Sequence, residues 1–552
     1  MFRTVFHFLL FVLSLAAGST AFAYSHADTL RGSNGRGRAW WNVKRYELTA
    51  TFDTASRSIS GSNEVSFTVT APPADSMQID LQEPMILDSV LLVSQVFPSV
   101  PAHAALAHEG NVWWVKYPFS KLKRDSVYTV VLYYHGTPRA AVNPPWDGGF
   151  SWKRDSLDHM WIAVSCQGFG ASSWWPCKDA QWEEPEEGMS ISLTVPAGMQ
   201  AVSNGRMVST GSGGGNTTTT WQVRNPINNY DVTFYIGDYV HWTDTIMGEK
   251  GTLDLAFYVL SYNEARAREH FAVVRQMIRC FEYWFGPYPF YEDGYKLVDA
   301  PYLGMEHQSA IAYGNGYKMG YKGIDRSMSG YGLKWDYIII HESGHEWFGN
   351  NITAHDMADN WIHEGITSFS ESLFTEWLVG REKGQKYSRG LWRGIDNEKP
   401  LIAAYGVNDE GTGDIYEKGA AVMHMIRVMM NDDERFRQLL RGLGKEFYHG
   451  IVTTQQVEAY IMRMSGLSLQ PFFNQYLRRA NIPVLEYYVK EDVLHYRFDQ
   501  VWPGFSLALI ASADDVQAPL TVTEQWQTIP WKGGPAARFT NDYLIKVRRL
   551  EQ

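Results

Sequence analysis

The hydrophobic pattern of the chain changes period near residue 260, and this change predicts two kinds of structure in succession. Between residues 46 and 242, apolar and polar side chains alternate in short runs separated by turn residues. Alternation with a period of two predicts half-buried strands. The clearest of these runs are 46–52, 64–69 and 127–134. A Gly-rich stretch, 211–216, predicts a hairpin loop before a strand over 217–223. We therefore expect a β-sandwich or a saddle-shaped sheet in this part.

Beyond residue 260 the apolar residues follow a helical period. The segment from Glu264 to Phe285 carries them at intervals of three and four residues, and Gly286 and Pro287 end the pattern. Further helices are expected over 369–378, 420–430, 435–440 and 455–463. Alternation returns after Ile482, most clearly over 493–498, and predicts a final strand-rich section.

These patterns predict an α+β chain of several domains without internal repeats. Residues 24–39 are polar and rich in Gly and Arg, so a flexible leader is expected there. The expected order is a targeting segment (1–23), this leader, a β-rich N-terminal domain (40–245), a mostly helical domain (246–480) and a small β-rich C-terminal domain (481–552).

The first 23 residues have the pattern of a signal peptide. Arg3 supplies the positive charge, and the apolar run from Phe6 to Ala17 is short for a bilayer span. Small residues at Ala21 and Ala23 predict cleavage before Tyr24 and export to a periplasm or the exterior. The alternative is an uncleaved membrane anchor. No other run reaches transmembrane length, so no stable membrane insertion is expected after cleavage.

Composition and charge narrow the function classes. The chain has 552 residues, with 45% hydrophobic and 20% charged residues, which is typical of a globular protein. Its net charge is −11 and no basic run occurs, which argues against nucleic-acid binding. Three cysteines are too few for a disulfide scaffold. Cys166 and Cys177 either pair with each other or remain buried free thiols, and both alternatives stay open.

The strongest chemical signal is the sequence from His341 to His345, followed by Glu364. Two histidines four residues apart lie on one face of a helix and suit convergence on one zinc ion. Glu342, between the histidines, is placed where a general base could accept a proton from a metal-activated water. Glu364 is at a distance along the chain that allows it to bind the metal from a second helix as a third ligand. Apolar residues precede both the histidine motif and Glu364 and indicate that these segments are buried. The histidines are therefore not expected to be surface residues without a function. The sequence therefore predicts one zinc ion in a catalytic site with an open coordination position.

Two weaker motifs flank this one. In the first, Gly304 allows a close backbone approach and Glu306 offers a charge where an amine could dock. The second is Tyr416 followed by Glu, Lys and Gly. Taken alone, the first motif is better explained by a surface glutamate beside a turn, and the second motif is also weak by itself.

In this order the motifs resemble those of the aminopeptidase N family of gluzincins, peptidase family M1, which also has an epoxide-hydrolysing branch. The resemblance extends to 176–179, 202–206 and 347–350 and covers most of residues 40–490. It implies a thermolysin-like catalytic domain and a zinc aminopeptidase acting on peptides with a free N-terminus. It also implies that the chain is a short form without the C-terminal helical domain of many relatives.

The resemblance also implies roles for individual residues. Glu342 would be the general base, and Tyr416 would stabilise the oxyanion. Glu306, helped by Gln167, would bind the free α-amine. Residues implied to contact the rest of the peptide are Gly304 and Met305 through the backbone, Tyr302 at the first side chain, and His307, which replaces the usual asparagine. Glu371 either orients a zinc-bound histidine or is a solvated or core glutamate.

Three alternative functions remain beside the aminopeptidase hypothesis. An endopeptidase or an epoxide hydrolase could use the same scaffold, and a non-catalytic peptide-binding relative could keep the fold. A carboxylate at Glu306 disfavours an uncharged peptide interior, which argues against the endopeptidase. The motifs specify neither the preferred N-terminal residue and peptide length nor the oligomeric state.

Overall fold

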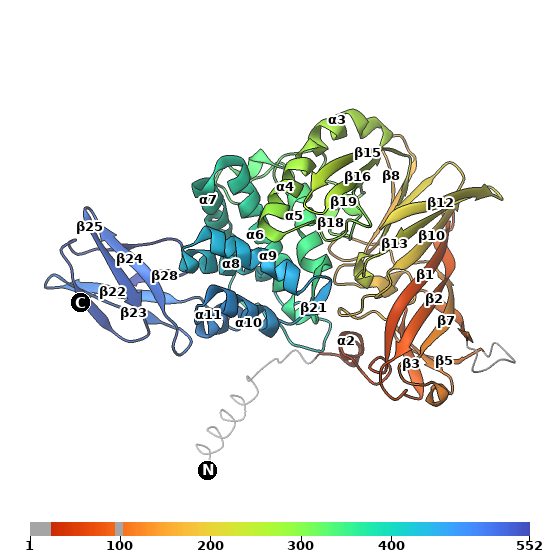
Figure 1. Ribbon diagram of the computed structural model, residues 1–552, viewed down its shortest axis with the longest axis horizontal. Coiled ribbons are helices and arrows are strands. Elements are labelled where there is room, and N and C mark those ends of the chain that lie inside the picture. The colour runs from red at the N-terminus through yellow and green to blue at the C-terminus, as the bar shows by residue number, and fades with distance from the viewer. Residues whose placement is uncertain (1–23, 94–102, 552) are drawn as a thin grey trace, which may run out of the picture.

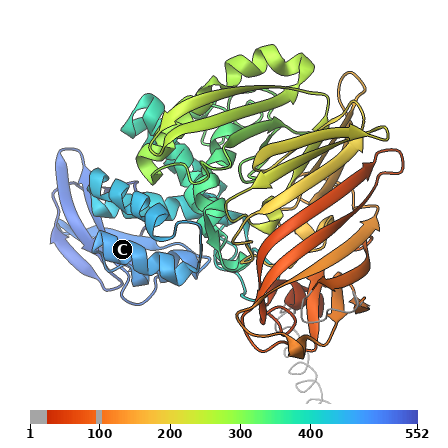
Figure 2. The ribbon, with the colours of Figure 1, turned by 45° about the vertical axis from the view of Figure 1, so that its right-hand side comes forward.

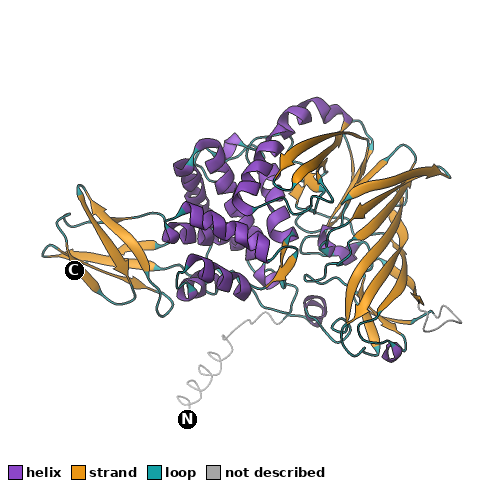
Figure 3. Cartoon of the chain, in the orientation of Figure 1, coloured by secondary structure: helices purple, strands orange, loops and turns teal. Residues whose placement is uncertain are grey.

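The computed structural model describes residues 24–93 and 103–551, and the predicted signal peptide with its cleavage site lies outside this part. Figure 1 shows strands from the N-terminal half on one side, helices in the centre and C-terminal strands at the far end. Figure 3 separates these layers by secondary structure. The predicted α+β multidomain class is confirmed. Among the described residues, no helix is both long and apolar enough to cross a membrane.

The N-terminal part is built on two main sheets that face each other. A seven-stranded sheet has the order β12-β13-β10-β1-β2-β7-β4, and a four-stranded sheet has the order β11-β14-β9-β8. Phe52 from the first sheet meets Phe234 from the second with ring centroids 4.7 Å apart. The strands of the larger sheet are β1 (Trp41–Asp53), β2 (Ser58–Val69), β4 (Ile86–Val93), β7 (Val127–Gly136), β10 (Met189–Pro196), β12 (Arg206–Gly213) and β13 (Asn216–Val223).

The smaller strands complete this part. The four-stranded sheet contains β8 (Gly149–Arg154), β9 (Met160–Ser165), β11 (Gln200–Ser203) and β14 (Phe234–Gly237). A third sheet contains β3 (Ser76–Asp80), β5 (Ala105–Glu109) and β6 (Val112–Lys116). The Gly-rich hairpin is tighter than expected, because β12 continues to Gly213 and only Gly214 and Gly215, both with positive φ, form the turn.

The segment expected as a flexible leader contains a short helix, α2 (His26–Gly32). Ser25 and Asp28 form a capping box that satisfies the first free backbone N–H groups. Further along, the Arg38 guanidinium is fully buried and pairs with Asp80 at 2.5 Å. A buried guanidinium needs such a partner, so the end of this segment is tied to strand β3.

The central part combines a five-stranded sheet with the helices. The sheet contains β15 (Tyr239–Gly248), β16 (Gly251–Leu260), β17 (Tyr295–Asp299), β18 (Gly304–Met305) and β19 (Ile311–Tyr313). The boundary expected at residue 245 thus falls inside β15. The expected helix over 264–285 is divided into α3 (Glu264–His270) and α4 (Val274–Phe285) by a 3-10 turn.

The remaining helices surround α6 (Trp361–Val379), which contacts α5 (Tyr337–Gly344), α7 (Arg381–Leu391) and α8 (Glu417–Met430). Beyond them lie α9 (Asp433–Glu446), α10 (Thr454–Ser465) and α11 (Gln470–Leu477). Short strands β20 (Ile352–Ala354) and β21 (Gly450–Val452) pair in parallel.

After α11 the described part of the chain forms strands only, and these strands make two small sheets. Figure 2 shows these strands in blue, on the far side of the helices from the N-terminal sheets. They are β22 (Val484–Lys490), β23 (Val493–Asp499), β24 (Leu507–Ala513), β25 (Val516–Val522), β26 (Gln527–Pro530), β27 (Arg538–Phe539) and β28 (Lys546–Arg549). An ion pair of 2.7 Å between Arg389 and Asp542 joins them to α7. All three cysteines, including Cys166 and Cys177, are free and buried in this structure.

We expect Arg38→Ala to lower the free energy of unfolding by about 3 kcal/mol, because it leaves the buried Asp80 carboxylate without its cation. Urea denaturation followed by circular dichroism measures this change. The control is Arg36→Ala, which removes an exposed pair with Asp75 and should leave stability unchanged. Equal stability of the two variants would contradict the role assigned to the buried pair.

Candidate metal centre and active site

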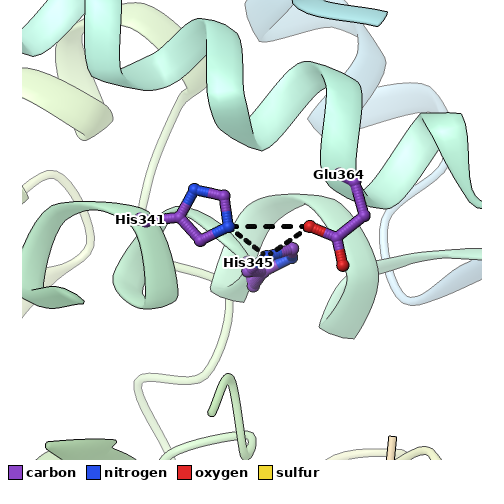
Figure 4. A group of neighbouring side chains, drawn as sticks. All are labelled: His341, His345 and Glu364. Carbon is purple, nitrogen blue, oxygen red and sulfur yellow. Dashed lines mark hydrogen bonds and ion pairs between the residues drawn. The ribbon is translucent and has the colours of Figure 1, made fainter. Parts of the chain in front are cut away.

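Three predicted ligands converge at the junction of α5 and α6. Asp336 caps α5 by accepting a hydrogen bond from the Ile338 amide at 2.9 Å, so the helix begins one turn before His341. His345 follows α5 directly with helical backbone angles, and Glu364 lies in the first turn of α6. Figure 4 shows the three side chains pointing toward one another.

The distances between the ligand atoms fit a single zinc ion. The two His Nε2 atoms are 3.3 Å apart, and the Glu364 Oε2 atom lies 3.3 Å from Nε2 of His345 and 3.6 Å from that of His341. Zinc–ligand bonds of 2.0–2.1 Å in a tetrahedron imply edges of about 3.3 Å. Glu364 Oε2 is buried and receives no hydrogen bond, so an acceptor atom points into the centre without a donor. Two imidazoles and one carboxylate leave a fourth position open.

Each histidine is oriented by a hydrogen bond from its other ring nitrogen. Nδ1 of His341 donates to Glu371 at 2.8 Å, and Nδ1 of His345 donates to the Phe348 carbonyl at 3.0 Å. Glu371 is fully buried and also accepts a bond of 2.6 Å from the Tyr387 hydroxyl. Protons on both Nδ1 atoms direct the Nε2 lone pairs to the same point. The structure thus places Glu371 against His341 rather than in solvent.

Glu342 and Tyr416 line the same cavity as the three ligands, a space of about 460 Å³. Burial raises the pKa of Glu342 to about 7, so this carboxylate suits proton transfer near neutral pH. Burial also raises the pKa of the Tyr416 phenol, which therefore stays protonated and able to donate. The Tyr416 ring is stacked beside His341 with centroids 6.0 Å apart. Gly304 borders the cavity, where an added Cβ would come within 2.8 Å of a Glu342 carboxylate oxygen.

Glu306 lies beside the metal centre and is held by residues from the N-terminal part. Its carboxylate accepts hydrogen bonds from the Gln167 amide at 3.2 Å and the Tyr230 hydroxyl at 3.3 Å. Gln167 also donates to Glu364 at 2.9 Å. Tyr230 was not predicted, because it lies in a 3-10 turn of the N-terminal part and no local motif marks it. The Asn350 side chain fixes the Glu306 backbone by donating to its carbonyl at 2.8 Å.

Three residues assigned by the resemblance to peptide contacts are not among those that line the cavity: Tyr302, Met305 and His307. Strand β18 ends at Met305, and Gly304 and Glu306 line the cavity whereas Met305 and His307 do not. His307 is fully buried with Nδ1 2.8 Å from the Tyr235 hydroxyl, and burial lowers its pKa to about 3. The imidazole therefore contacts the N-terminal part in this structure, and the peptide contact assigned to His307 stays a prediction.

Tyr302 also points away, since its hydroxyl donates to the Val164 carbonyl at 2.8 Å and its ring joins the N-terminal core. The assigned backbone roles of Gly304 and Met305 stay predictions.

The cavity contains further charged groups that the motifs did not indicate. Arg326 donates to the Tyr337 hydroxyl at 2.6 Å and pairs with Glu417. Glu410 comes from the loop before Tyr416. Because carboxylates outnumber Arg326 around this space, the cavity favours a positively charged group.

Residues 270–476 match the family model described as the peptidase family M1 domain. The chain carries a peptidase family M1 domain. The resemblance drawn from the motifs is thereby confirmed, and the M1 domain implies one catalytic zinc ion, which the ligand geometry fits.

Curated relatives of the M1 domain are distant. Aminopeptidase B of Rattus norvegicus is 25% identical over 316 residues, which are 53% of this chain and 45% of the relative. Aminopeptidase M1-D of Oryza sativa subsp. japonica is 22% identical over 347 residues, 59% of this chain and 38% of the relative. Leukotriene A-4 hydrolase of Xenopus laevis is 21% identical over 453 residues, 76% of this chain and 68% of the relative. The matches to the first two thus span less than half of each relative.

Solved structures share the fold of the M1 domain and its N-terminal sheets. A two-domain M1 zinc metallopeptidase bound to L-tryptophan matches with a TM-score of 0.67 and 20% identity, covering 81% of this chain and 96% of the other. An M1 zinc metallopeptidase from Deinococcus radiodurans, bound to a Tyr-Ser-Ala substrate, matches with a TM-score of 0.66 and 19% identity, covering 81% and 96%. At these identities the likeness establishes the fold.

We expect Glu371→Gln to weaken zinc binding by about 10- to 100-fold, because the His341 N–H loses its charged acceptor. A competition titration with a chromogenic chelator measures the affinity, and wild-type protein should hold one zinc per chain. The control is Glu382→Gln, an exposed change in the first turn of α7. If both variants bound zinc as tightly as wild type, Glu371 would have no orienting role.

Proposed function

We propose that this chain is a zinc-dependent aminopeptidase that removes the N-terminal residue from peptides. One observation carries the proposal: the buried Glu306 carboxylate lies in the same cavity as the metal ligands and is joined to Glu364 through Gln167. A buried carboxylate with neutral donors around it has room for a cation as partner. The peptide ammonium is the cation that a peptide N-terminus supplies.

The chemistry follows from the groups around the cavity. A zinc ion held by His341, His345 and Glu364 would polarise the scissile carbonyl and acidify the attacking water. Glu342 accepts the proton from this water and delivers it to the leaving amine nitrogen. The Tyr416 phenol donates a hydrogen bond to the carbonyl oxygen as negative charge develops on it. Water adds across the C–N bond, so the products are a free amino acid and a peptide shortened by one residue.

The position of Glu306, the proposed binding site of the peptide ammonium, favours an exopeptidase over the alternative functions. With the ammonium held at Glu306, the bond presented to Glu342 is the one that follows the first residue. An endopeptidase would have to bury the Glu306 charge against an uncharged chain, which is costly. An epoxide offers Glu306 no ammonium group, so the geometry favours the peptide over the epoxide-hydrolysing alternative. The complete set of ligands, base and phenol favours an enzyme over a non-catalytic binding protein.

Export belongs to the same proposal and rests on the sequence of residues 1–23 alone. An exported aminopeptidase would meet peptides outside the cytoplasm.

We expect Glu342→Gln to reduce kcat by about a thousandfold, because the amide cannot accept the proton of the attacking water. Aminoacyl-coumarin substrates measure the rate, and metal analysis should show unchanged zinc content. Full hydrolysis by this variant would overturn the assignment of the base.

We expect Glu306→Gln to lower kcat/KM for substrates with a free amine by roughly a hundredfold, because the ammonium loses a buried ionic partner. The same substrates with an acetylated amine give the control, since their slow cleavage should not change. An equal effect on both substrate classes would mean that the amine binds elsewhere.

A further inference from the structure

The short helix α2 contacts the loop that leads into Tyr416. The Asn408 amide donates to the Asp28 carbonyl at 3.2 Å, and the Tyr24 hydroxyl donates to the Asp409 carboxylate at 2.8 Å. Gly32 lies directly against the backbone of Val407, where an added Cβ would be 2.2 Å from the carbonyl carbon. Only a glycine allows this approach.

The other side of α2 is attached to the N-terminal part. The Leu30 carbonyl accepts a bond from Gln78 at 3.1 Å, and the Arg31 carbonyl accepts one from Arg38 at 2.6 Å. The Arg31 side chain lies 3.9 Å from Asp179. Helix α2 is therefore connected to the N-terminal sheets on one side and to the loop 407–409 on the other.

The contacts of α2 with its neighbours are not part of a hydrophobic core. No residue of α2 is buried, and a helix of seven residues is not stable by itself. The polar and backbone contacts on its two sides are what keep it in place. Its position in Figure 1, between the N-terminal strands and the helical part, agrees with a connecting role.

Helix α2 and the loop also form the rear of the amine site. Arg31 and Gly32 line a small cavity of about 40 Å³ that is also lined by Asn408, Gln167 and Glu306. The same loop continues through Glu410 and Gly413, which line the catalytic cavity, to Tyr416.

We propose that residues 24–32 act as a clasp that positions the loop 407–413 and closes the rear of the amine-binding site. Gly32 is its main positioning residue, and Tyr24 is a second one. The clasp keeps solvent away from the far side of Gln167 and Glu306, where a dry environment strengthens the attraction for an ammonium group. Its kinetic consequence rests on the aminopeptidase function proposed above, whereas its effect on the loop does not.

The test compares Gly32→Val with Gly35→Val in the full chain. Neither glycine has a positive φ, and a Cβ at Gly35 would meet only the Ser33 hydroxyl at 3.8 Å. Gly32→Val should displace Val407 and break the Asn408 hydrogen bond. Hydrogen exchange measured by mass spectrometry should then be about tenfold faster in residues 406–413, with exchange in α6 unchanged.

The kinetic arm measures the same variants with a free-amine substrate. We expect KM to rise about fivefold in Gly32→Val with kcat within about twofold of wild type, and no change in Gly35→Val. Tyr24→Phe removes the hydrogen bond to Asp409 and adds no steric bulk, so it should raise KM by a smaller factor. It supplies the readout if Gly32→Val fails to fold.

Unchanged exchange of 406–413 in both clasp variants would overturn the proposal. Faster exchange with an unchanged KM would also overturn it, because the loop would then have no influence on the amine site. If wild-type protein cleaved no aminoacyl substrate, the proposed function would fail. In that case the test of the clasp would combine hydrogen exchange with calorimetric measurement of leucinamide binding, since this amine can bind without being cleaved. An affinity for leucinamide that is the same in the clasp variants and in wild type would overturn the proposal.

Discussion

The amide of Gln167 is the contact on which the geometry of the site depends. Its two N–H groups point at two buried carboxylates, Glu306 at 3.2 Å and Glu364 at 2.9 Å. Without a donor between them, two carboxylates at this depth repel each other and one takes up a proton. The amide keeps Glu306 available to a cation while leaving the other oxygen of Glu364 free for the metal centre. It also fixes the position of the Glu306 carboxylate relative to the metal ligand Glu364.

The loop that carries Gln167 is in turn held by buried polar contacts. Asp179 accepts hydrogen bonds from the Ser172 amide and hydroxyl, and its backbone carbonyl accepts one from Arg38. Arg38 pairs with Asp80 on strand β3. Buried polar contacts thus link strand β3 through Arg38 and Asp179 to Ser172, which follows Gln167 in the same loop. Hydrogen bonds of this kind help to fix the loop in one arrangement.

Local patterns in the sequence predicted the parts of this molecule that depend on local periodicity. The ligands His341 and His345 follow from helical spacing, and the change of period near residue 260 separates strands from helices. Contacts between distant segments left no such trace, so Tyr230 beside Glu306 was missed. For His307 the family pattern predicted a place beside the peptide, whereas in the structure its imidazole contacts the Tyr235 hydroxyl of the N-terminal part, so the assigned peptide contact stays a prediction. The capping box at Ser25 was readable, but a helix without buried residues has no apolar period to reveal it.

The two halves of the site differ in how far along the chain their residues lie from one another. The metal ligands fall within the stretch from His341 to Glu364, on α5 with its C-cap residue and on the first turn of α6. Gln167 is 139 residues from Glu306 and 197 from Glu364. Short-range contacts form early in folding and long-range contacts form late, since the entropy of closing a long loop must be overcome first. A folding chain of this protein would therefore bring its three metal ligands together before the Gln167 bridge joins Glu306 to Glu364, so the metal centre would mature before its surroundings.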